Sequence, residues 1–178
     1  MWLNLRSIFQ SLSHDPSVRA IILTGAGPRA FTSGLDIQAA SAGPTFSASS
    51  SLDPARKANA LRRHILEFQA CISALEACEK PVIAVLHGVC FGLAMDISLA
   101  CDVRIASRDA RMSVKEVDIG IAADIGTLSR LPHCVGNMSW VKEVALSARV
   151  FGAEEALRVG LVSNVYAAKT EAVDEVCS

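Results

Sequence analysis

The sequence lacks the short motifs that mark several large enzyme classes. It contains no G-x-S-x-G nucleophile elbow, no P-loop and no G-x-G-x-x-G dinucleotide fingerprint. Its six cysteines include no C-x-x-C pair, and its four histidines form no cluster at metal-ligand spacing. These absences argue against hydrolases with that elbow, P-loop NTPases, Rossmann dehydrogenases, zinc ribbons and dithiol redox proteins. We therefore predict no metal site.

The sequence also lacks a strong charge of either sign, a membrane-length apolar run and a targeting segment. Lys and Arg number 17 and Asp and Glu 18, interspersed, which predicts no nucleic-acid partner and no binding to anionic lipid. The longest apolar stretch is interrupted by His87, Gly88, Gly92 and Asp96, so we expect no membrane span. Neither end resembles a secretory signal, a transit peptide or a peroxisomal address. Several cysteines lie within apolar runs as small hydrophobic residues, which favours a reducing compartment.

Apolar side chains, by contrast, are abundant. They make up 51% of the 178 residues, and the mean hydropathy of +0.36 is high for a soluble domain. The length allows one domain with a sizeable core, and we find no internal repeat and no second domain. The apolar excess predicts elements that are buried on both faces, or a surface that a partner covers.

Apolar periodicity predicts helices and strands in alternation. The predicted helices cover residues 2–12, a short stretch entered through 30–40, a long stretch that starts at 53–54, residues 92–100, and two or three later segments. The predicted strands cover residues 18–25, 81–88, 102–107 and 161–166, and residues 41–52 are predicted to form a mobile loop. Since each strand is apolar throughout, the predicted fold class is α/β, with parallel strands covered on both sides.

The long helix has a defined start and a defined core face. Asp53 and Pro54 are a favourable N-cap and first-turn pair. Spacings of four and three residues predict one stripe toward the core, made of Leu61, Ile65, Phe68, Ile72 and Leu75.

Two glycine-containing turns each stand between a predicted strand and a predicted helix. Residues 33–36 read SGLD, and residues 88–92 read GVCFG. Such turns leave backbone N–H groups at the helix start that can bind an anion or a developing oxyanion. The alternatives are structural: Asp36 caps its helix, and Asp96 gains about 0.3–1 kcal/mol beside a helix N-terminus.

A third segment, residues 113–128, places acids among aliphatic residues in what reads as a packed, nearly apolar loop. Structural roles remain open here too, because Asp124 can cap a following helix, and Glu116 can be a surface acid paired with Lys115 or Arg111. The combination of two N–H-rich turns with three acids beside apolar strands favours a different interpretation. It predicts a site whose carboxylates have raised proton affinity, because desolvation and like charge both disfavour ionisation.

Four segments, in this order, resemble the enoyl-CoA hydratase/isomerase (crotonase) superfamily: AFTSGLDI, KPVIAVLHGVCFGLAMDISLACDVRIAS, VKEVDIGIAADIGTLSRLP and AEEALRVGLVSNVY. The resemblance implies a ClpP/crotonase-like spiral of repeated ββα units, with residues 1–178 forming a single but incomplete domain. The superfamily has a strand before the first helix and C-terminal trimerisation helices, which this chain lacks. We therefore expect a homotrimer or hexamer for the complete protein, and low solubility and weak or no activity for this chain alone.

Within the superfamily, the trio Asp96, Glu116 and Asp124 resembles the dienoyl-CoA isomerases. That resemblance implies isomerisation of 3,5-dienoyl-CoA to 2,4-dienoyl-CoA in fatty acid β-oxidation. Glu116 would take a proton from C2, Asp124 would return one at C6, and Asp96 would lie between them and tune both. The acyl-CoA thioester is the expected partner, no cofactor is expected beyond the coenzyme A of the substrate, and the expected location is the mitochondrion or peroxisome.

The resemblance also assigns binding groups at both turns. The backbone N–H groups of Ser33 and Leu93 would form the oxyanion hole. The superfamily usually has consecutive glycines where this chain has Gly92, Leu93 and Ala94, so we expect Leu93 to affect rate or acyl-chain preference rather than the type of reaction. The expected acyl-CoA-binding residues are Ser33, Gly34, Leu35, Asp36, Ile37 and Ala94.

Two alternative functions stay open. The first is an enoyl-CoA hydratase or a Δ3,Δ2-enoyl-CoA isomerase. Asp96 argues against the hydratase, because hydratases have Glu at this position and a shorter acid holds the attacking water less well. The second is a non-catalytic acyl-CoA-binding remnant of the enzyme.

Overall fold

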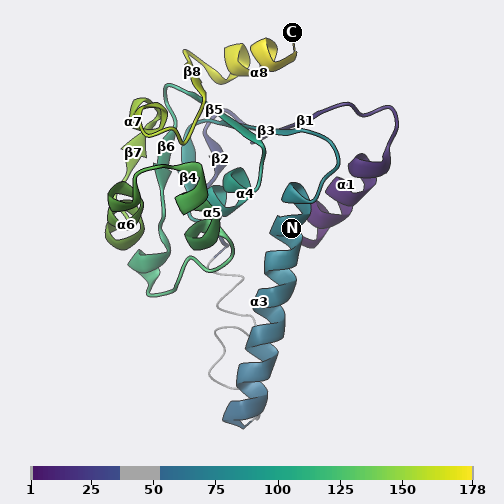
Figure 1. The fold of residues 1–178 in the computed structure, drawn as a ribbon, viewed down its shortest axis with the longest axis vertical. Helices are drawn as coiled ribbons and strands as arrows, with labels where there is room; N and C mark the ends of the chain where they lie inside the picture. The colour runs from purple at the N-terminus through teal and green to yellow at the C-terminus, as the bar shows by residue number, and fades with distance from the viewer. Residues whose placement is uncertain (1, 37–52, 178) are drawn as a thin grey trace.

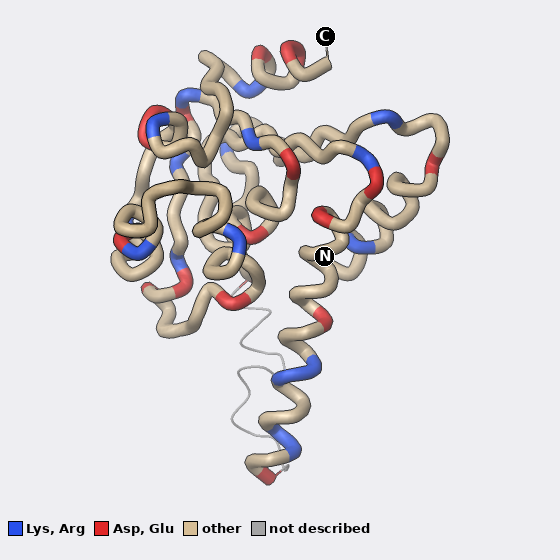
Figure 2. Tube along the Cα trace, in the orientation of Figure 1, with Lys and Arg blue, Asp and Glu red and all other residues tan. Residues whose placement is uncertain are grey.

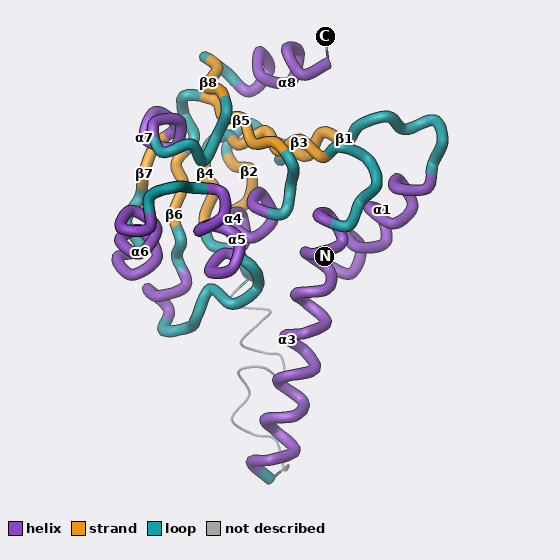
Figure 3. The backbone as a smooth tube through the Cα atoms, viewed as in Figure 1, coloured by secondary structure: helices purple, strands orange, loops and turns teal. Residues whose placement is uncertain are grey.

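The computed structural model describes residues 2–36 and 53–177. The helices are α1 (Trp2–His14), α3 (Pro54–Glu76), α4 (Leu93–Leu99), the 3-10 helix η1 (Glu116–Ile119), α5 (Thr127–Cys134), α6 (Met138–Ser147), α7 (Ala153–Arg158) and α8 (Lys169–Cys177). The strands are β1 (Ile21–Thr24), β2 (Ala30–Thr32), β3 (Val82–Leu86), β4 (Val89–Phe91), β5 (Val103–Ser107), β6 (Arg111–Ser113), β7 (Phe151–Gly152) and β8 (Asn164–Tyr166). Figures 1 and 3 show their arrangement.

The strands form two four-stranded sheets, in the orders β1-β3-β5-β8 and β2-β4-β6-β7. Every pair is parallel except β6 with β7. Successive strands alternate between the sheets, since β1, β3 and β5 enter the first while β2, β4 and β6 enter the second. Each of these strand pairs is followed by a helical segment, so the chain advances as a spiral of ββα units. The predicted α/β fold and its repeated unit are confirmed.

The centre of the molecule is β3 and α4. In β3, Val82, Ala84, Val85 and Leu86 are buried, as expected for a strand with a neighbour on either side. All seven residues of α4 are buried, because this short helix contacts α3, α5, β2 and β4. Side chains on α4 therefore face other elements of the fold rather than bulk water.

The long helix α3 begins as predicted but packs over only part of its length. The side chain of Asp53 accepts hydrogen bonds from the N–H groups of Ala55 and Arg56, both at 3.0 Å. At the inner end, the Trp2 ring of α1 stacks on Phe68 with ring centroids 4.5 Å apart. Leu61 is 39% exposed, because the outer half of α3 extends beyond the sheets (Figure 1). The predicted stripe is correct at Phe68, Ile72 and Leu75 and wrong at Leu61.

Two further expectations need correction or fall outside the described residues. Residues 30–32 form strand β2, because they pair in parallel with β4, so they do not lead directly into a helix. The predicted loop at 41–52 and residues 37–40 of the predicted short helix lie outside the described residues. After η1 the described chain contains α5, α6, α7 and also α8, one helix more than the two or three expected.

Charged residues are interspersed along the described chain, as Figure 2 shows for both signs. Within residues 2–36 and 53–177, no helix is both long enough and apolar enough to cross a membrane.

The half-packed helix α3 gives a test of the core. Ile72 is fully buried, so Ile72→Ala is expected to lower the free energy of unfolding by about 2–5 kcal/mol through lost burial and a new cavity. Leu61→Ala, on the exposed half of the same helix, is the matched control and should change it by about 0.5 kcal/mol or less. Urea unfolding of both variants measures the difference, and equal losses would contradict the packing described above.

Candidate active site

The two glycine turns lie against each other. Gly34 follows β2 with a φ of +100°, in the region that favours glycine. A Cβ atom at Gly34 would meet the Phe91 carbonyl oxygen at 2.9 Å and the Leu93 nitrogen at 3.6 Å. Backbone atoms cannot rotate away as a flexible side chain can. Only a residue without Cβ therefore allows the turn after β2 to approach the start of α4 this closely.

Gly92 brings a carboxylate to the same place. Its φ of +56° also favours glycine, and a Cβ there would lie 3.3 Å from Glu116 Oε1 and 3.9 Å from Gly34 Cα. The Gly92 N–H donates to the Ser113 carbonyl at 3.0 Å, which ties this turn to β6. Leu93 is the first residue of α4, where a backbone N–H has no acceptor within the helix. The turn after β2, the turn before α4 and the Glu116 carboxylate therefore meet at Gly92.

Asp96 is the most deeply buried of the three predicted acids, with 1% of its surface exposed. It lies in the first turn of α4, and its Oδ1 accepts hydrogen bonds from the Thr127 N–H at 2.7 Å and the Thr127 hydroxyl at 2.8 Å. Burial raises the pKa of Asp96, while the bonds from Thr127 and the charge of Arg130 act in the opposite direction.

Glu116 is half-buried and begins η1. Its Oε2 is buried and has no hydrogen-bond partner among the described residues. Desolvation raises the pKa of Glu116, and the negative charges of Asp96 and Asp124 raise it further. The three acids are thus close enough to interact, and Glu116 holds its proton more tightly than an exposed glutamate does.

Asp124 departs from the expectation of a dry site, because its side chain is exposed. Its carbonyl accepts a hydrogen bond from Gln69 Nε2 of α3 at 2.7 Å, and the N-cap of α5 is Gly126, so Asp124 is not the predicted cap. The segment is also less packed than its composition suggests, because Val117 and Ile119 are 44% and 48% exposed. Aliphatic residues in a connecting segment do not by themselves produce burial.

Lys115 does not pair with Glu116. Its Nζ donates to Asp118 at 2.8 Å and to the Ala148 carbonyl at 2.9 Å, and that carbonyl also accepts from the Ser113 hydroxyl at 2.8 Å. One backbone oxygen therefore holds two residues that precede Glu116, and no Lys, Arg or His among residues 2–36 and 53–177 forms an ion pair with the Glu116 carboxylate. Ala148 has a φ of +50°, which is unusual for a residue with a Cβ.

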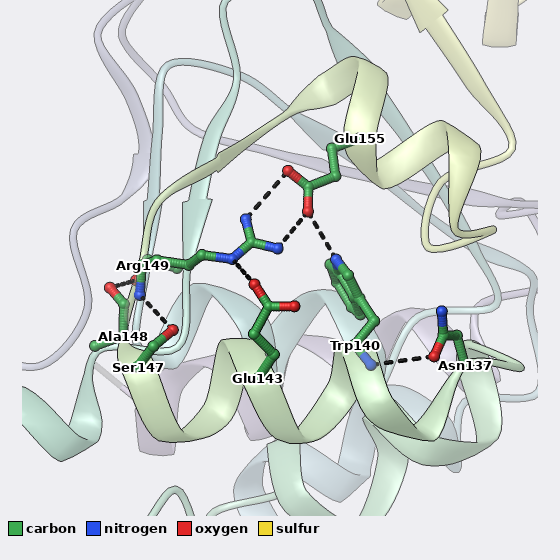
Figure 4. Close-up of polar contacts among 8 residues, drawn as sticks. Asn137, Trp140, Glu143, Ser147, Ala148, Arg149 and Glu155 are labelled. Carbon is green, nitrogen blue, oxygen red and sulfur yellow. Dashed lines mark hydrogen bonds and ion pairs between the residues drawn. The ribbon is translucent and has the colours of Figure 1, made fainter.

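Ala148 directly follows α6 and precedes Arg149, whose side chain joins a charged cluster above that helix (Figure 4). In that cluster Arg149 bonds to both Glu143 and Glu155, and the Trp140 indole N–H donates to Glu155 at 2.7 Å. The cluster fixes the residue next to Ala148 and so supports the left-handed backbone there. Sequence reasoning missed this support, since nothing in the order of residues links 148 to 116.

The remaining predicted residues lie around the first turn and α4. Ser33 and Asp36 are exposed, Leu35 packs at the edge of the core, and Ile37 lies outside the described residues. The side chains of Leu93 and Ala94 belong to the core, so Leu93 points away from the turn surface on which its N–H is presented. In the described part of the chain, no three His, Cys, Asp or Glu side chains gather closely enough to hold a metal.

Thr127 and Gly126 are site residues that sequence reasoning did not identify. The signal was the G-T pair two and three residues after Asp124, since Thr is a favoured residue at helix starts. What the pattern does not reveal is that Thr127 bonds to Asp96, which is 31 residues away.

Two mostly parallel sheets built from ββα units, with backbone turns beside buried and half-buried carboxylates, define a crotonase-like protein. Pseudomonas aeruginosa DspI has the same fold, with a TM-score of 0.82 and 29% identity over 98% of this chain and 62% of that chain. An enoyl-CoA hydratase from Bacillus anthracis matches with a TM-score of 0.82 and 29% identity over 98% of this chain and 63% of that chain. The chain belongs to the enoyl-CoA hydratase/isomerase family, which it matches over residues 1–177.

Within the family, several curated relatives of this chain are dienoyl-CoA isomerases. The peroxisomal Δ(3,5)-Δ(2,4)-dienoyl-CoA isomerase of Arabidopsis thaliana is 48% identical over 90% of this chain and 57% of its own length. The mitochondrial Δ(3,5)-Δ(2,4)-dienoyl-CoA isomerases of mouse and human are 45% and 42% identical, over 93% and 97% of this chain and 50% and 52% of their own lengths. The chain spans about half the length of these relatives.

The raised pKa of Glu116 predicts a stability change of known sign. Since the folded state binds this proton more tightly than the unfolded state, ionising Glu116 destabilises the fold. The destabilisation is absent below the ordinary glutamate pKa of about 4.3 and complete above the raised pKa. Glu116→Gln is therefore expected to raise the free energy of unfolding at about pH 8 and to leave it unchanged near pH 4.

Urea unfolding at both pH values measures this effect. The matched control is Glu67→Gln, an exposed glutamate on α3, which should change little at either pH. A Glu116→Gln variant that is less stable than the parent at about pH 8 would contradict the prediction.

The close approach at Gly92 makes a second prediction. Gly92→Ala is expected to destabilise the chain by about 1–3 kcal/mol, because alanine is strained at this φ. It should also alter the titration of Glu116, since the new methyl group presses on Oε1. Gly120→Ala is the control, because Gly120 also has a positive φ, +72°, but no atom lies within 4 Å of its added Cβ. Carboxyl NMR titration separates the two variants, and an equal response at Glu116 would contradict the contact.

Proposed function

We propose that this chain carries the catalytic segment of a 3,5-dienoyl-CoA isomerase, which forms 2,4-dienoyl-CoA. The observation that supports it most is that the Glu116 carboxylate lies against Gly92, where the two backbone turns meet, with the negative charges of Asp96 and Asp124 acting on it. Moving a pair of double bonds requires removal of one proton and return of another at a distant carbon. Two acid/base groups near one anion-binding site match that requirement.

The proposed reaction begins at Glu116. In its ionised form, Glu116 takes a proton from C2, and the electrons of the C–H bond spread through the diene to the thioester oxygen. A raised pKa makes the carboxylate a stronger base, which favours abstraction from carbon near neutral pH. The unpartnered Oε2 supports this role, since no described residue occupies it.

The negative charge on the thioester oxygen needs donors. We propose the backbone N–H groups of Ser33 and Leu93, because the turns that carry them touch through Gly34. Loss of one such donor typically raises a barrier by about 3–4 kcal/mol. Gly34, Leu35, Asp36, Ile37 and Ala94 stay predicted acyl-CoA-binding residues.

Asp124 is the proposed proton donor at C6, where the bond from oxygen to hydrogen breaks as the new C–H bond forms. It is exposed in this chain. An acyl chain that covers it would exclude water from this side of the site. Asp96 is the third charge, which acts on Glu116 rather than on the substrate.

The wider setting follows the relatives. Their names place them in peroxisomes and mitochondria, and we propose these two organelles for this protein. The acyl-CoA thioester is the proposed partner, and we propose no cofactor beyond its coenzyme A. The homotrimer or hexamer stays a prediction, for which the exposure of Met138 and Leu146 is a supporting observation.

The assay follows the ultraviolet absorbance of the product, whose double bonds conjugate with the thioester carbonyl. Glu116→Gln and Asp124→Asn are each expected to lower kcat/KM by about 10²–10⁴-fold, because each removes one acid/base group. Asp118→Asn is the matched control on η1, since Asp118 is exposed and pairs with Lys115, and it should retain most of the activity.

Three outcomes would overturn the proposal. If Glu116→Gln turned over the substrate as fast as the parent, Glu116 would not be the catalytic base. Hydration of a 2-enoyl-CoA without dienoyl-CoA turnover would indicate a hydratase. Binding of the dienoyl-CoA without turnover would indicate an acyl-CoA-binding protein.

A further inference from the structure

Thr127 gives both of its hydrogen-bond donors to a single oxygen. The Thr127 N–H and hydroxyl reach Asp96 Oδ1 at 2.7 and 2.8 Å, and both residues are almost completely buried, with 0% and 1% exposure. Two donors on one carboxylate oxygen favour its ionised form, and such bonds are stronger than those between neutral groups. The contact between Thr127 and Asp96 therefore affects the charge of Asp96 as well as the packing of the core.

The same contact completes the start of α5. The N-cap residue, Gly126, supplies no side-chain acceptor, so the carboxylate of Asp96 from α4 occupies that role across the core. A Cβ at Gly126 would clash with the Arg130 guanidinium and lie 3.7 Å from Asp96 Oδ1. The guanidinium and the carboxylate therefore both lie against the backbone at Gly126.

The segment that carries Asp124 is held near both ends. Before α5, Gln69 of α3 bonds to the Asp124 carbonyl, and three residues later Thr127 bonds to Asp96. Arg130 of α5 adds a further tether, because it bonds to Ser73 on α3. Loss of the Thr127 bonds to Asp96 would therefore release the C-terminal end of the segment that carries Asp124, while the bond from Gln69 remains.

Charged groups on neighbouring elements act on Asp96 and Glu116. Arg130 on α5 acts on Asp96, and it is itself paired with Glu76 on α3 at 2.8 Å. Asp96 and Asp124 act on Glu116 from α4 and from the segment before α5. Lys115, beside Glu116, is paired with Asp118.

We propose that Thr127 is a positioning residue whose two hydrogen bonds stabilise the ionised form of Asp96 and direct its carboxylate at α5. When ionised, Asp96 places a negative charge beside Glu116, and its bonds to Thr127 fix the end of the segment that carries Asp124. The expected effect on kcat/KM rests on the proposed isomerase function. The expected effect on the titration of Asp96 and Glu116 does not depend on that function.

The test is Thr127→Val, which keeps the shape but loses the hydroxyl bond, against Thr127→Ser, which keeps that bond. Carboxyl NMR titration of the purified chain is the first readout. In Thr127→Val the Asp96 carboxyl should titrate at higher pH, because its charged form loses a donor. Glu116 should titrate at lower pH, because it then ionises beside a neutral neighbour. Thr127→Ser should leave both titrations close to those of the parent.

The second readout is the pH profile of kcat/KM for dienoyl-CoA isomerisation. Thr127→Val should lower kcat/KM by roughly tenfold or more, as expected for loss of a hydrogen bond to a charged group, and move the acid limb of the profile to lower pH. Thr127→Ser should restore both. If Thr127→Val fails to fold, Asp96→Asn keeps an oxygen acceptor for Thr127 and removes the charge, and Glu116 should again titrate at lower pH.

Unchanged titration of both acids in folded Thr127→Val, or of Glu116 in Asp96→Asn, would overturn the inference. If the titrations move as stated but no dienoyl-CoA is converted, the inference holds and the proposed function fails. If dienoyl-CoA is converted and the titrations do not move, the inference alone fails.

Discussion

Withdrawal of carboxylates from water is the constraint on which this structure depends. An ionised acid loses its hydration when it is buried, so the fold must either supply hydrogen bonds or tolerate a raised pKa. Both acids have a raised pKa, but Asp96 has its charged form partly compensated by Thr127, whereas one oxygen of Glu116 is buried with no hydrogen-bond partner among the described residues. The well-packed centre around β3 and α4 supplies the stability that this arrangement requires.

Both solutions depend on unusually close backbone approaches. Gly34, Gly92 and Gly126 each stand where an added Cβ would meet backbone atoms, a carboxylate or a guanidinium. At Ala148 a residue with a Cβ adopts a left-handed conformation and turns its carbonyl toward Ser113 and Lys115. These four positions contribute little apolar burial. They determine how the backbone turns and the polar side chains of the site are oriented.

Much of the fold could be predicted from local pattern. Asp53 was recognised as an N-cap and the strand at 81–88 as a buried one, since each signal lies within a few residues. Leu61 was placed wrongly in the core, because helical spacing describes a face without stating how far the neighbouring element extends. The contacts of Lys115 and Asp124 could not be predicted for a similar reason, since the Ala148 and Gln69 partners are 33 and 55 residues away.

The sequence by itself determined the alternation of strands and helices, the two glycine turns, and the identity of the three acids, because these depend on residue type and short-range spacing. Folding in three dimensions then decides that Asp96 is buried against Thr127, that Glu116 is half-buried with no ion-pair partner among the described residues, and that Asp124 faces water. Exposure and charge interactions are properties of segments that meet in space. No local pattern contains the distance between a residue on α4 and one on α5.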